Sequence, residues 1–216
     1  YLNQAGLSRL LRPICRAIAI PLVIHVRLLE DVARVTPMRG TARSSLDLIF
    51  ISDAMADAAG HADLPAGTEW HMAYDPYPLA PQPRPLPQTA PFSSVGRLSH
   101  GKGMHLLVEA LAQPELADAR IDIYGAGVEG DDYAERLADG AKNLAGRVRL
   151  MGFHQDVIQR LPAYRFLVST SHYESLGRVV MEAWEAGLVP IVYAGSGGSA
   201  EMVNKSGGGL SFNDWT

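Results

Sequence analysis

The sequence predicts an α/β fold built on parallel sheets, and three observations support that prediction. Short apolar, β-branched runs alternate with amphipathic helical stretches along most of the 216 residues. The runs are almost wholly apolar, which is typical of strands that helices cover on both faces of a parallel sheet. Hydrophobic residues make up 47% of the chain, which is enough for a sizeable core. Together these features indicate the Rossmann-like class.

The expected strands are short runs rich in β-branched and aromatic residues. In chain order they are Pro21–Val26, Leu46–Ser52, Trp70–Tyr74, Phe92–Val95, Arg120–Tyr124, Arg147–Gly152, Phe166–Thr170 and Val189–Tyr193. Helices are expected between most of them, for example at Gly103–Ala112, Asp131–Leu144 and Arg178–Ala186. In the first of these helices apolar residues recur at spacings of three and four, so one face can pack on the sheet.

A proline-rich stretch interrupts the alternation. Seven prolines lie between Pro76 and Pro91, and proline fixes φ and lacks a backbone donor, so neither a helix nor a central strand can run through. We predict a semi-rigid linker over residues 76–91, with a long surface loop as the alternative. Residues 1–75 then form part of one Rossmann-like domain, and residues 92–216 form a second domain that is nearly complete.

Composition and charge exclude several classes of protein. The net charge is −4, which argues against a general nucleic-acid binder. A single cysteine excludes an internal disulfide framework, and the seven histidines show no spacing typical of a zinc site. No apolar run reaches the length of a membrane-spanning helix. The chain also lacks a G-x-S-x-G elbow, so a hydrolase triad has no nucleophile candidate.

A glycine-rich segment with two cations follows the expected strand Phe92–Val95 and precedes a helix. It reads Gly96-Arg97-Leu98-Ser99-His100-Gly101-Lys102-Gly103. Ligands of open parallel sheets bind at the carboxyl ends of strands, where this loop would lie. Two fixed positive charges suit a diphosphate, and glycines allow close backbone approach. The order of a P-loop is absent, and a turn with solvated cations is the alternative.

A formal G-x-G-x-x-G runs from Gly125 to Gly130, after the strand Arg120–Tyr124. A dinucleotide site needs a helix that opens inside this motif and an acid at the end of the next strand. Here the acidic pair after Gly130 indicates a later helix start, and the next strand ends in Met151-Gly152-Phe153 without an acid. We therefore expect a tight turn at a strand end rather than a NAD site.

Two glutamates flank one predicted helix N-terminus. Glu174 lies in the loop after the strand Phe166–Thr170, Ser175 can cap the following helix, and Glu182 lies on its second turn. Free N–H groups at a helix start hold anions, while carboxylates accept hydrogen bonds from the vicinal hydroxyls of a ribose or a sugar. A solvated Glu174 and a helix-surface Glu182 are the alternative.

A histidine, His25, lies near the end of the apolar run Pro21–Val26. At the carboxyl end of a parallel strand it can reach an active-site crevice. A lone histidine is more often structural, and both interpretations stay open at this point.

Taken together, these motifs resemble the retaining glycosyltransferases of the GT-B type, the group 1 glycosyl transferases that include glycogen synthases, sucrose synthases and phosphatidylinositol mannosyltransferases. The features that carry the resemblance are Val95-Gly96-Arg97-Leu98 with Lys102-Gly103, Ile123-Tyr124-Gly125-Ala126-Gly127, Val148-Arg149-Leu150-Met151-Gly152-Phe153, and the E-x7-E pair Glu174/Glu182 followed by Gly197-Gly198-Ser199-Ala200-Glu201. Each is weak alone, but their order and separation are specific. The N-terminal part matches more loosely, since Val26 stands where the group usually has Asp after the histidine.

The resemblance implies a role for each candidate residue. The implied site comprises Arg97, Lys102, Leu176 and Gly177 at the donor diphosphate, Glu182 at the ribose, Gly152, Phe153 and His154 at the base, and Glu174 and His25 as the catalytic residues that contact the donor sugar. Residues 1–75 would belong to the acceptor-side domain and residues 92–216 to the donor domain. The chain would be a fragment that lacks part of each.

The implied activity is transfer of a sugar from a nucleotide-diphosphate sugar to an acceptor with retention of configuration. The implied mechanism needs no enzyme nucleophile, metal or cofactor, because fixed cations and a helix dipole can stabilise the leaving diphosphate. The expected partners are the nucleotide-sugar donor and an acceptor that is a glycan, a lipid or a small molecule, with no nucleic acid. The expected location is cytoplasmic, with peripheral membrane contact and an oligomer left open.

Two other functions remain as alternatives. A nucleotide-sugar epimerase of the same two-domain plan would need acid and base side chains around the sugar C2 position, and the sequence does not obviously supply them. A nucleotide-sugar-binding module without activity would share the donor-side motifs.

Overall fold

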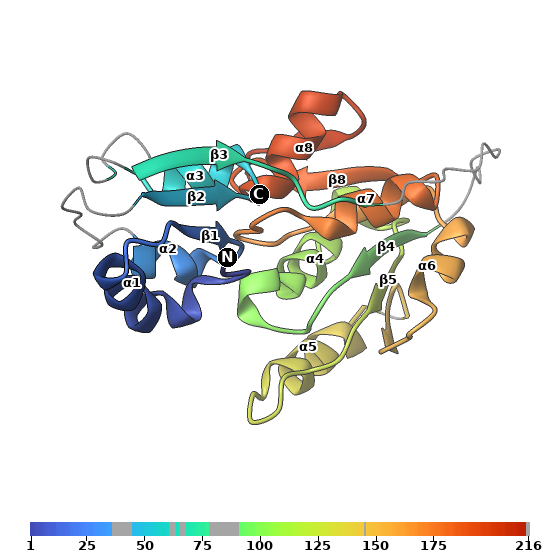
Figure 1. The fold of residues 1–216 in the computed structure, drawn as a ribbon. Coiled ribbons are helices and arrows are strands. Elements are labelled where there is room, and N and C mark those ends of the chain that lie inside the picture. The colour runs from blue at the N-terminus through green and yellow to red at the C-terminus, as the bar shows by residue number, and fades with distance from the viewer. Residues whose placement is uncertain (36–44, 61–63, 65–67, 78–90, 145, 215–216) are drawn as a thin grey trace. The chain divides into compact units, whose positions relative to one another are not determined.

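A computed structural model describes residues 1–35, 45–60, 64, 68–77, 91–144 and 146–214. The chain divides into two units, Tyr1–Pro76 and Tyr77–Thr216. Each unit has its own parallel sheet with helices between successive strands (Figure 1). The predicted α/β class with parallel sheets is therefore confirmed. Most of the predicted proline-rich linker, residues 78–90, lies outside the described residues.

The first unit contains a three-stranded parallel sheet in the order β1-β2-β3. Its strands are β1 (Leu22–Val26), β2 (Leu46–Phe50) and β3 (Thr68–Met72), and its helices are η1 (Ala5–Leu7), α1 (Ser8–Ala17), α2 (Leu29–Val35) and α3 (Asp53–Ala58). The apolar side chains of β1 and β2 are buried, whereas β3 is largely exposed. The third strand was predicted two residues later, at Trp70–Tyr74, because its alternation is weak.

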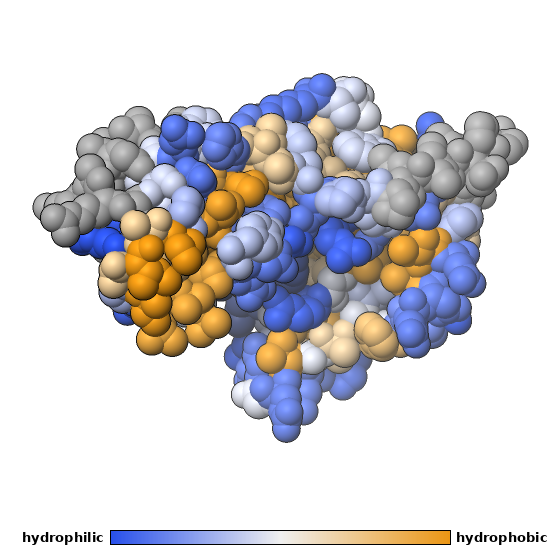
Figure 2. All heavy atoms as spheres, in the orientation of Figure 1, coloured by the Kyte–Doolittle hydropathy of each residue, from blue (hydrophilic) through white to orange (hydrophobic). Residues whose placement is uncertain are grey.

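One face of α1 is apolar and open to solvent. The large apolar side chains on this face are Leu10 and Ile14 of α1, with Leu7 directly before the helix and Ile18 directly after it, and all four are exposed. They recur at spacings of three and four, which places them on one helix face. Figure 2 shows this face as an orange area over α1. This helix therefore packs on the first unit mainly through its other face.

The second unit contains a six-stranded parallel sheet in the order β6-β5-β4-β7-β8-β9. The strands are β4 (Phe92–Val95), β5 (Ile121–Tyr124), β6 (Val148–Gly152), β7 (Phe166–Ser169), β8 (Val189–Tyr193) and β9 (Leu210–Phe212). The helices are η3 (His100–Lys102), α4 (Met104–Leu111), η4 (Pro114–Leu116), α5 (Tyr133–Lys142), α6 (Val157–Arg160), η5 (Leu161–Ala163), α7 (Arg178–Glu185) and α8 (Gly198–Ser206). The short strand β9 was not predicted, because three residues carry too little pattern.

The strand order places a topological switch point between β4 and β7. The chain moves from β4 outward to β5 and β6, and then returns to pair β7 with the other side of β4. At such a point the loops that leave two neighbouring strands diverge and open a crevice at the carboxyl end of the sheet. The loop after β4 carries the two predicted cations, and the loop after β7 carries Glu174 and leads into α7 (Arg178–Glu185), which carries Glu182.

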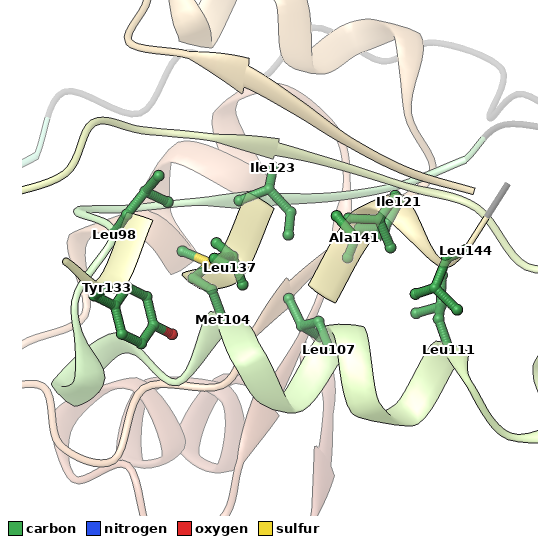
Figure 3. Close-up of a cluster of buried hydrophobic side chains, with 11 residues drawn as sticks. Leu98, Met104, Leu107, Leu111, Ile121, Ile123, Tyr133, Leu137, Ala141 and Leu144 are labelled. Atoms are coloured by element: carbon green, nitrogen blue, oxygen red, sulfur yellow. The ribbon is translucent and has the colours of Figure 1, made fainter. Parts of the chain in front are cut away.

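A cluster of buried side chains joins α4 and α5 to this sheet (Figure 3). Met104, Leu107 and Leu111 of α4 point into it, as the spacing of three and four predicted. Leu98, three residues after the end of β4, belongs to the same cluster. The glycine-rich loop between β4 and α4 is therefore anchored by apolar packing at both ends.

A second set of buried contacts is polar. Asp122 of β5 is buried, and its carboxylate accepts hydrogen bonds from Arg149 Nε at 2.6 Å and from the Tyr164 hydroxyl at 2.7 Å. The hydroxyls of Tyr164 and Tyr124 also lie within hydrogen-bond distance, at 2.7 Å. Burial raises the pKa of Tyr164, and the hydrogen bonds to Tyr124 and Asp122 raise it further. The buried negative charge is thus held by an arginine and a neutral phenol.

The replacement Arg149→Met should destabilise the second unit by leaving this buried carboxylate without its cation. A buried acceptor that loses its donor costs about 1–3 kcal/mol, and because the Arg149 side chain is 59% exposed, water recovers part of that loss. Urea unfolding would measure the change. The matched control is Arg160→Met, because Arg160 pairs with Asp156, which is well exposed. For this variant we expect the free energy of unfolding to fall by at most about 0.5 kcal/mol. Equal losses for both variants would contradict this role of Asp122.

Candidate functional site

The loops after β4 and β7 are joined by backbone contacts at the switch point of the six-stranded sheet. The backbone N–H of His172 donates to the carbonyl of Gly101 at 3.0 Å. Gly103, between η3 and α4, has a φ of 65°, a conformation that favours glycine. These contacts bring together two segments that lie about seventy residues apart in the chain, as expected of a switch point.

Lys102 and Glu174 form an ion pair across these two loops. Their side chains are only 24% and 17% exposed, respectively. A charge-assisted hydrogen bond in such a setting is stronger than one in bulk water, because the local dielectric is lower. The sequence predicted separate roles for the two residues, and it gave no sign that they touch.

Two of the three predicted base-binding residues, Phe153 and His154, line a cavity together with parts of the first two glycine motifs. The cavity has a volume of about 290 Å³ and lies at the carboxyl ends of β4, β5 and β6. Its lining residues are Val95, Gly96, Arg97, Tyr124, Gly125, Ala126, Gly127, Phe153, His154 and Val157. Phe153 is 73% exposed at its edge. A mostly apolar hollow with few polar groups is typical of a small-molecule site.

The glycine motif after β5 is a tight turn that packs against the motif after β4. A Cβ at Gly125 would lie 1.8 Å from the carbonyl oxygen of Gly96, so a side chain there cannot be accommodated. The N–H of Leu98 donates to the carbonyl of Ala126 at 2.8 Å. Helix α5 begins at Tyr133, after the motif. This is the arrangement expected of a turn rather than of a dinucleotide fingerprint.

His154 is oriented by its own loop. Its Nε2 lies 3.0 Å from the carbonyl oxygen of Met151, and its ring packs edge-on against Tyr124 with ring centroids 5.7 Å apart. Gly152, with a φ of 75°, turns the chain so that Phe153 and His154 follow β6 directly. The three residues predicted at the base therefore lie on one turn, and two of them line the cavity.

The N-terminus of α7 is shaped by Gly177, which has a φ of 82° and is the N-cap residue. A Cβ at Gly177 would lie 2.1 Å from the Ser199 hydroxyl, so only glycine fits. The prediction that Ser175 caps this helix is wrong, because the helix begins at Arg178, three residues later, and no side chain caps it. Leu176 and Gly177 are both buried, so little of either residue is open to solvent.

Glu182 lies on α7 and is half-buried. Burial raises its pKa above the ordinary value, Arg178 opposes the rise and Glu185 adds to it. One turn further along, Glu185 accepts a hydrogen bond from the Tyr77 hydroxyl at 2.5 Å. The sequence gave no signal for this contact, since the two residues are separated by 108 positions. It fixes the first residue of the second unit to the helix that carries Glu182.

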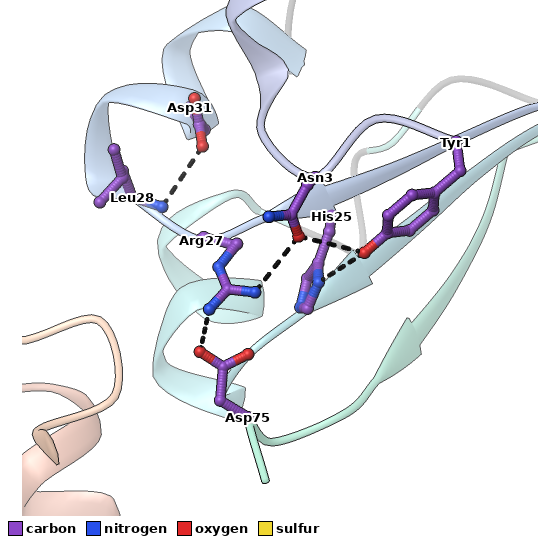
Figure 4. Close-up of polar contacts among 7 residues, drawn as sticks. All are labelled: Tyr1, Asn3, His25, Arg27, Leu28, Asp31 and Asp75. Carbon is purple, nitrogen blue, oxygen red and sulfur yellow. Dashed lines mark hydrogen bonds and ion pairs between the residues drawn. The ribbon is translucent and has the colours of Figure 1, made fainter.

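His25 belongs to the first unit, on β1 (Figure 4). It is buried, and its Nδ1 lies 3.1 Å from the Tyr1 hydroxyl. Burial lowers its pKa, the charge of Arg27 lowers it further and Asp75 raises it. Arg27 itself pairs with Asp75. His25 is therefore a neutral imidazole at neutral pH, whereas the other predicted site residues belong to the second unit.

The described residues contain neither a candidate metal cluster nor a candidate membrane span. No three His, Cys, Asp or Glu side chains there are grouped so that they could hold a metal ion. Within the same ranges, none of the helices has the length and apolarity needed to cross a membrane.

Known proteins resemble the second unit most closely. Residues 83–214 match the family described as Glycosyl transferases group 1. The lipopolysaccharide core biosynthesis glycosyltransferase LpsE of Rhizobium meliloti (strain 1021) is 34% identical over 117 residues, which are 54% of this chain and 33% of that protein. A glycogen synthase of Xanthomonas oryzae pv. oryzae (strain PXO99A) is 31% identical over 123 residues, 56% of this chain and 24% of the relative. The chain thus spans a third or less of these curated relatives.

Solved structures share the fold of both units. Anabaena Alr3699/HepE in complex with UDP-glucose matches with a TM-score of 0.73 and 24% identity, over 97% of this chain and 62% of that one. The lipopolysaccharide outer core galactosyltransferase WaaB matches with a TM-score of 0.68 and 17% identity, over 93% of this chain and 64% of that one. At these identities the likeness shows the fold, which is that of the GT-B glycosyltransferases.

The family match covers more than half of the chain and includes every predicted site residue except His25. The same stretch holds the switch point, the paired loops after β4 and β7 and the cavity beside them. The chain therefore belongs to the group 1 glycosyl transferases.

Proposed function

We propose that the protein transfers a sugar from a nucleotide-diphosphate sugar to an acceptor, with retention of configuration, and that the second unit binds the donor. The observation that carries the proposal is the convergence at one switch point of Lys102, Glu174 and the N-terminus of α7, with Arg97 on the neighbouring cavity wall. Positive charge, free amides and carboxylates at one sheet edge suit a ligand with a diphosphate and hydroxyls.

In this proposal each group acts on one part of the donor. Arg97 and Lys102 neutralise the diphosphate and the charge that develops on it as the glycosidic bond breaks. The first peptide groups of α7 add the positive end of a helix dipole. Glu182 accepts hydrogen bonds from the ribose hydroxyls and Glu174 from those of the sugar. The apolar cavity beside Phe153 and His154 takes the base.

The fixed cations and helix dipole are proposed to supply the leaving-group stabilisation without a metal or a further cofactor. Retention without an enzyme nucleophile requires the acceptor to attack from the face that the diphosphate leaves. His25, neutral because its pKa is lowered, would donate or accept a hydrogen bond at the donor sugar without adding charge.

The full-length protein tests the proposal directly. UDP-glucose is the first donor to examine, because a solved structure of similar fold contains it, and ADP- and GDP-sugars follow. Incubation with oligosaccharide, lipid and small-molecule acceptors should give a glycoside whose anomeric configuration, measured by NMR, equals that of the donor. An inverted product would overturn the assignment of retention. Isomerisation of the donor sugar without transfer would instead support the epimerase alternative. Binding of the donor without any turnover would support the alternative of a nucleotide-sugar-binding module.

Lys102→Met should weaken the binding of a nucleoside diphosphate. A hydrogen bond to a charged group is worth about 1.5–3 kcal/mol, so the dissociation constant should rise roughly 10- to 150-fold. Titration calorimetry with UDP would measure it. Lys142→Met is the matched control, because that ammonium pairs with Asp139 on the exposed face of α5 and its loss should leave the affinity unchanged. An unaltered affinity in a folded Lys102→Met protein would remove Lys102 from the site.

The two glutamates should respond differently to removal of charge. Glu182→Gln should weaken UDP and UDP-glucose alike, because both carry the ribose. Glu174→Gln should weaken UDP-glucose, which loses a sugar contact, while UDP binds at least as well as before, because the Lys102 ammonium is released from its ion pair. The ratio of the two affinities in each variant is the readout. Equal losses for both ligands in both variants would contradict the division of roles.

Acidification should weaken UDP binding at a higher pH than an ordinary glutamate would allow. Burial raises the pKa of Glu182, so the carboxylate that accepts the ribose hydroxyls is protonated earlier as the pH falls. Affinities measured between about pH 8 and about pH 5 should therefore fall progressively toward the acidic end. In Glu182→Gln this part of the pH dependence should vanish, and its persistence would assign the titration to another group.

A further inference from the structure

We propose that Thr170 is a positioning residue for the donor diphosphate, because it fixes the backbone at Lys102 and so directs the lysine ammonium. The inference rests on the role proposed above for Lys102. Thr170 directly follows β7 and is buried. Nothing in its sequence context marks it, since a threonine at the end of an apolar strand is an ordinary strand residue.

The hydroxyl of Thr170 makes a defined contact with the cation loop. Its Oγ1 donates to the backbone carbonyl oxygen of Lys102 at 2.9 Å. Two residues later, the N–H of His172 donates to the carbonyl oxygen of Gly101 at 3.0 Å. Two consecutive carbonyls of η3 are therefore held by one short segment that follows β7.

Gly103, the next residue of the loop, lies in close contact with the same threonine. A Cβ at Gly103 would lie 2.4 Å from the carbonyl oxygen of Thr170, closer than real side chains approach backbone. Gly103 also has the left-handed conformation that lets α4 begin at Met104. Each of residues 101–103 thus lies against Thr170 or His172, and Lys102 is in the middle of this contact.

The position of the Lys102 backbone matters because the side chain is long and flexible. A lysine side chain carries roughly 2 kcal/mol of rotamer entropy, so its charged end is directed only when its base is fixed. Here the ammonium reaches Glu174, which lies four residues after Thr170 on the same loop. Thr170 therefore fixes the lysine end of the ion pair through its hydroxyl, whereas the backbone of Glu174 is held by Ser196 and Gly198.

The chain offers a matched set of variants. Thr170→Val removes the hydroxyl and keeps the branched shape, whereas Thr170→Ser keeps the hydroxyl. Ser93→Ala is a control, because Ser93 Oγ donates to the carbonyl of Phe166 at 3.0 Å in the same sheet, between the same two strands. Ser93 lies near the start of β4 and Phe166 begins β7, so this contact is away from the cation loop. A merely structural role would make Thr170→Val and Ser93→Ala behave alike.

The first measurement compares the chemical reactivity of lysine side chains and needs no ligand. The sequence contains three lysines, Lys102, Lys142 and Lys205, whose side chains are 24%, 75% and 49% exposed. Acetylation with acetic anhydride, followed by mass spectrometry of the three peptides, compares their reactivity within one sample. In Thr170→Val the rate at Lys102 should rise roughly 2- to 10-fold, the equivalent of one net hydrogen bond. The rates at Lys142 and Lys205 should stay constant, and Thr170→Ser should resemble the unaltered protein.

The second readout separates the phosphates from the rest of the ligand. Calorimetry on the full-length protein compares UDP with uridine, or ADP and GDP with their nucleosides where these bind better. Thr170→Val should weaken the diphosphate roughly 2- to 10-fold and leave the nucleoside unchanged, with recovery in Thr170→Ser. In a Lys102→Met background the same replacement should have no further effect, because the group that it positions is absent.

The outcomes separate the two proposals. An equal loss for UDP and uridine, an effect that persists without Lys102, or unaltered acetylation of Lys102 in Thr170→Val would overturn the role of Thr170. If Lys102→Met itself leaves diphosphate binding intact, the proposed function of Lys102 fails, and the acetylation rates still decide whether Thr170 positions it.

Discussion

The pairing of β7 with β4 is the constraint on which the rest of the second unit depends. The chain leaves β4 on one side, builds β5 and β6, and returns to the other side of β4 before it continues to β8 and β9. Ser93 pairs with Leu167 across this junction, and the Ser93 hydroxyl bonds to the carbonyl of Phe166. Because both strands are parallel, their carboxyl ends and the loops that follow meet at the same edge. Lys102 and Glu174 can form an ion pair only because of this junction.

Two ion pairs in the second unit illustrate the difference between a charge that stabilises the fold and a charge that is available to bind a ligand. Asp122 is buried and is held by both Arg149 and Tyr164, so its carboxylate has several partners. Lys102 and Glu174 are less deeply buried and hold each other by a single contact. A buried charge with several partners is costly to disturb. A pair that is partly open to solvent can exchange one partner for a phosphate or a hydroxyl at small cost, which suits a site.

The sequence predicts the fold well and the contacts of the site poorly, for a physical reason. Buried strands and amphipathic helices are local patterns, and α4 follows its predicted apolar spacing residue by residue. The ion pair of Lys102 with Glu174, the bond from Tyr77 to Glu185 and the Thr170 hydroxyl on the cation loop join residues 68 to 108 positions apart. No local pattern encodes such contacts. Candidate site residues could be named from the sequence because motifs at strand ends are recognisable, whereas the residues that contact them could not be named.

The donor site proposed here has one rigid part and one adaptable part. At the phosphates, residues 101–103 and 170–172 are fixed by backbone bonds and by glycines that leave no space for a side chain. At the base, Phe153 is exposed, and the cavity wall behind it is mostly apolar. Every nucleotide-diphosphate sugar carries the same diphosphate, whereas bases and sugars differ. A rigid site for the diphosphate, with less constrained groups around the base, therefore allows one fold to keep its reaction while its donor changes.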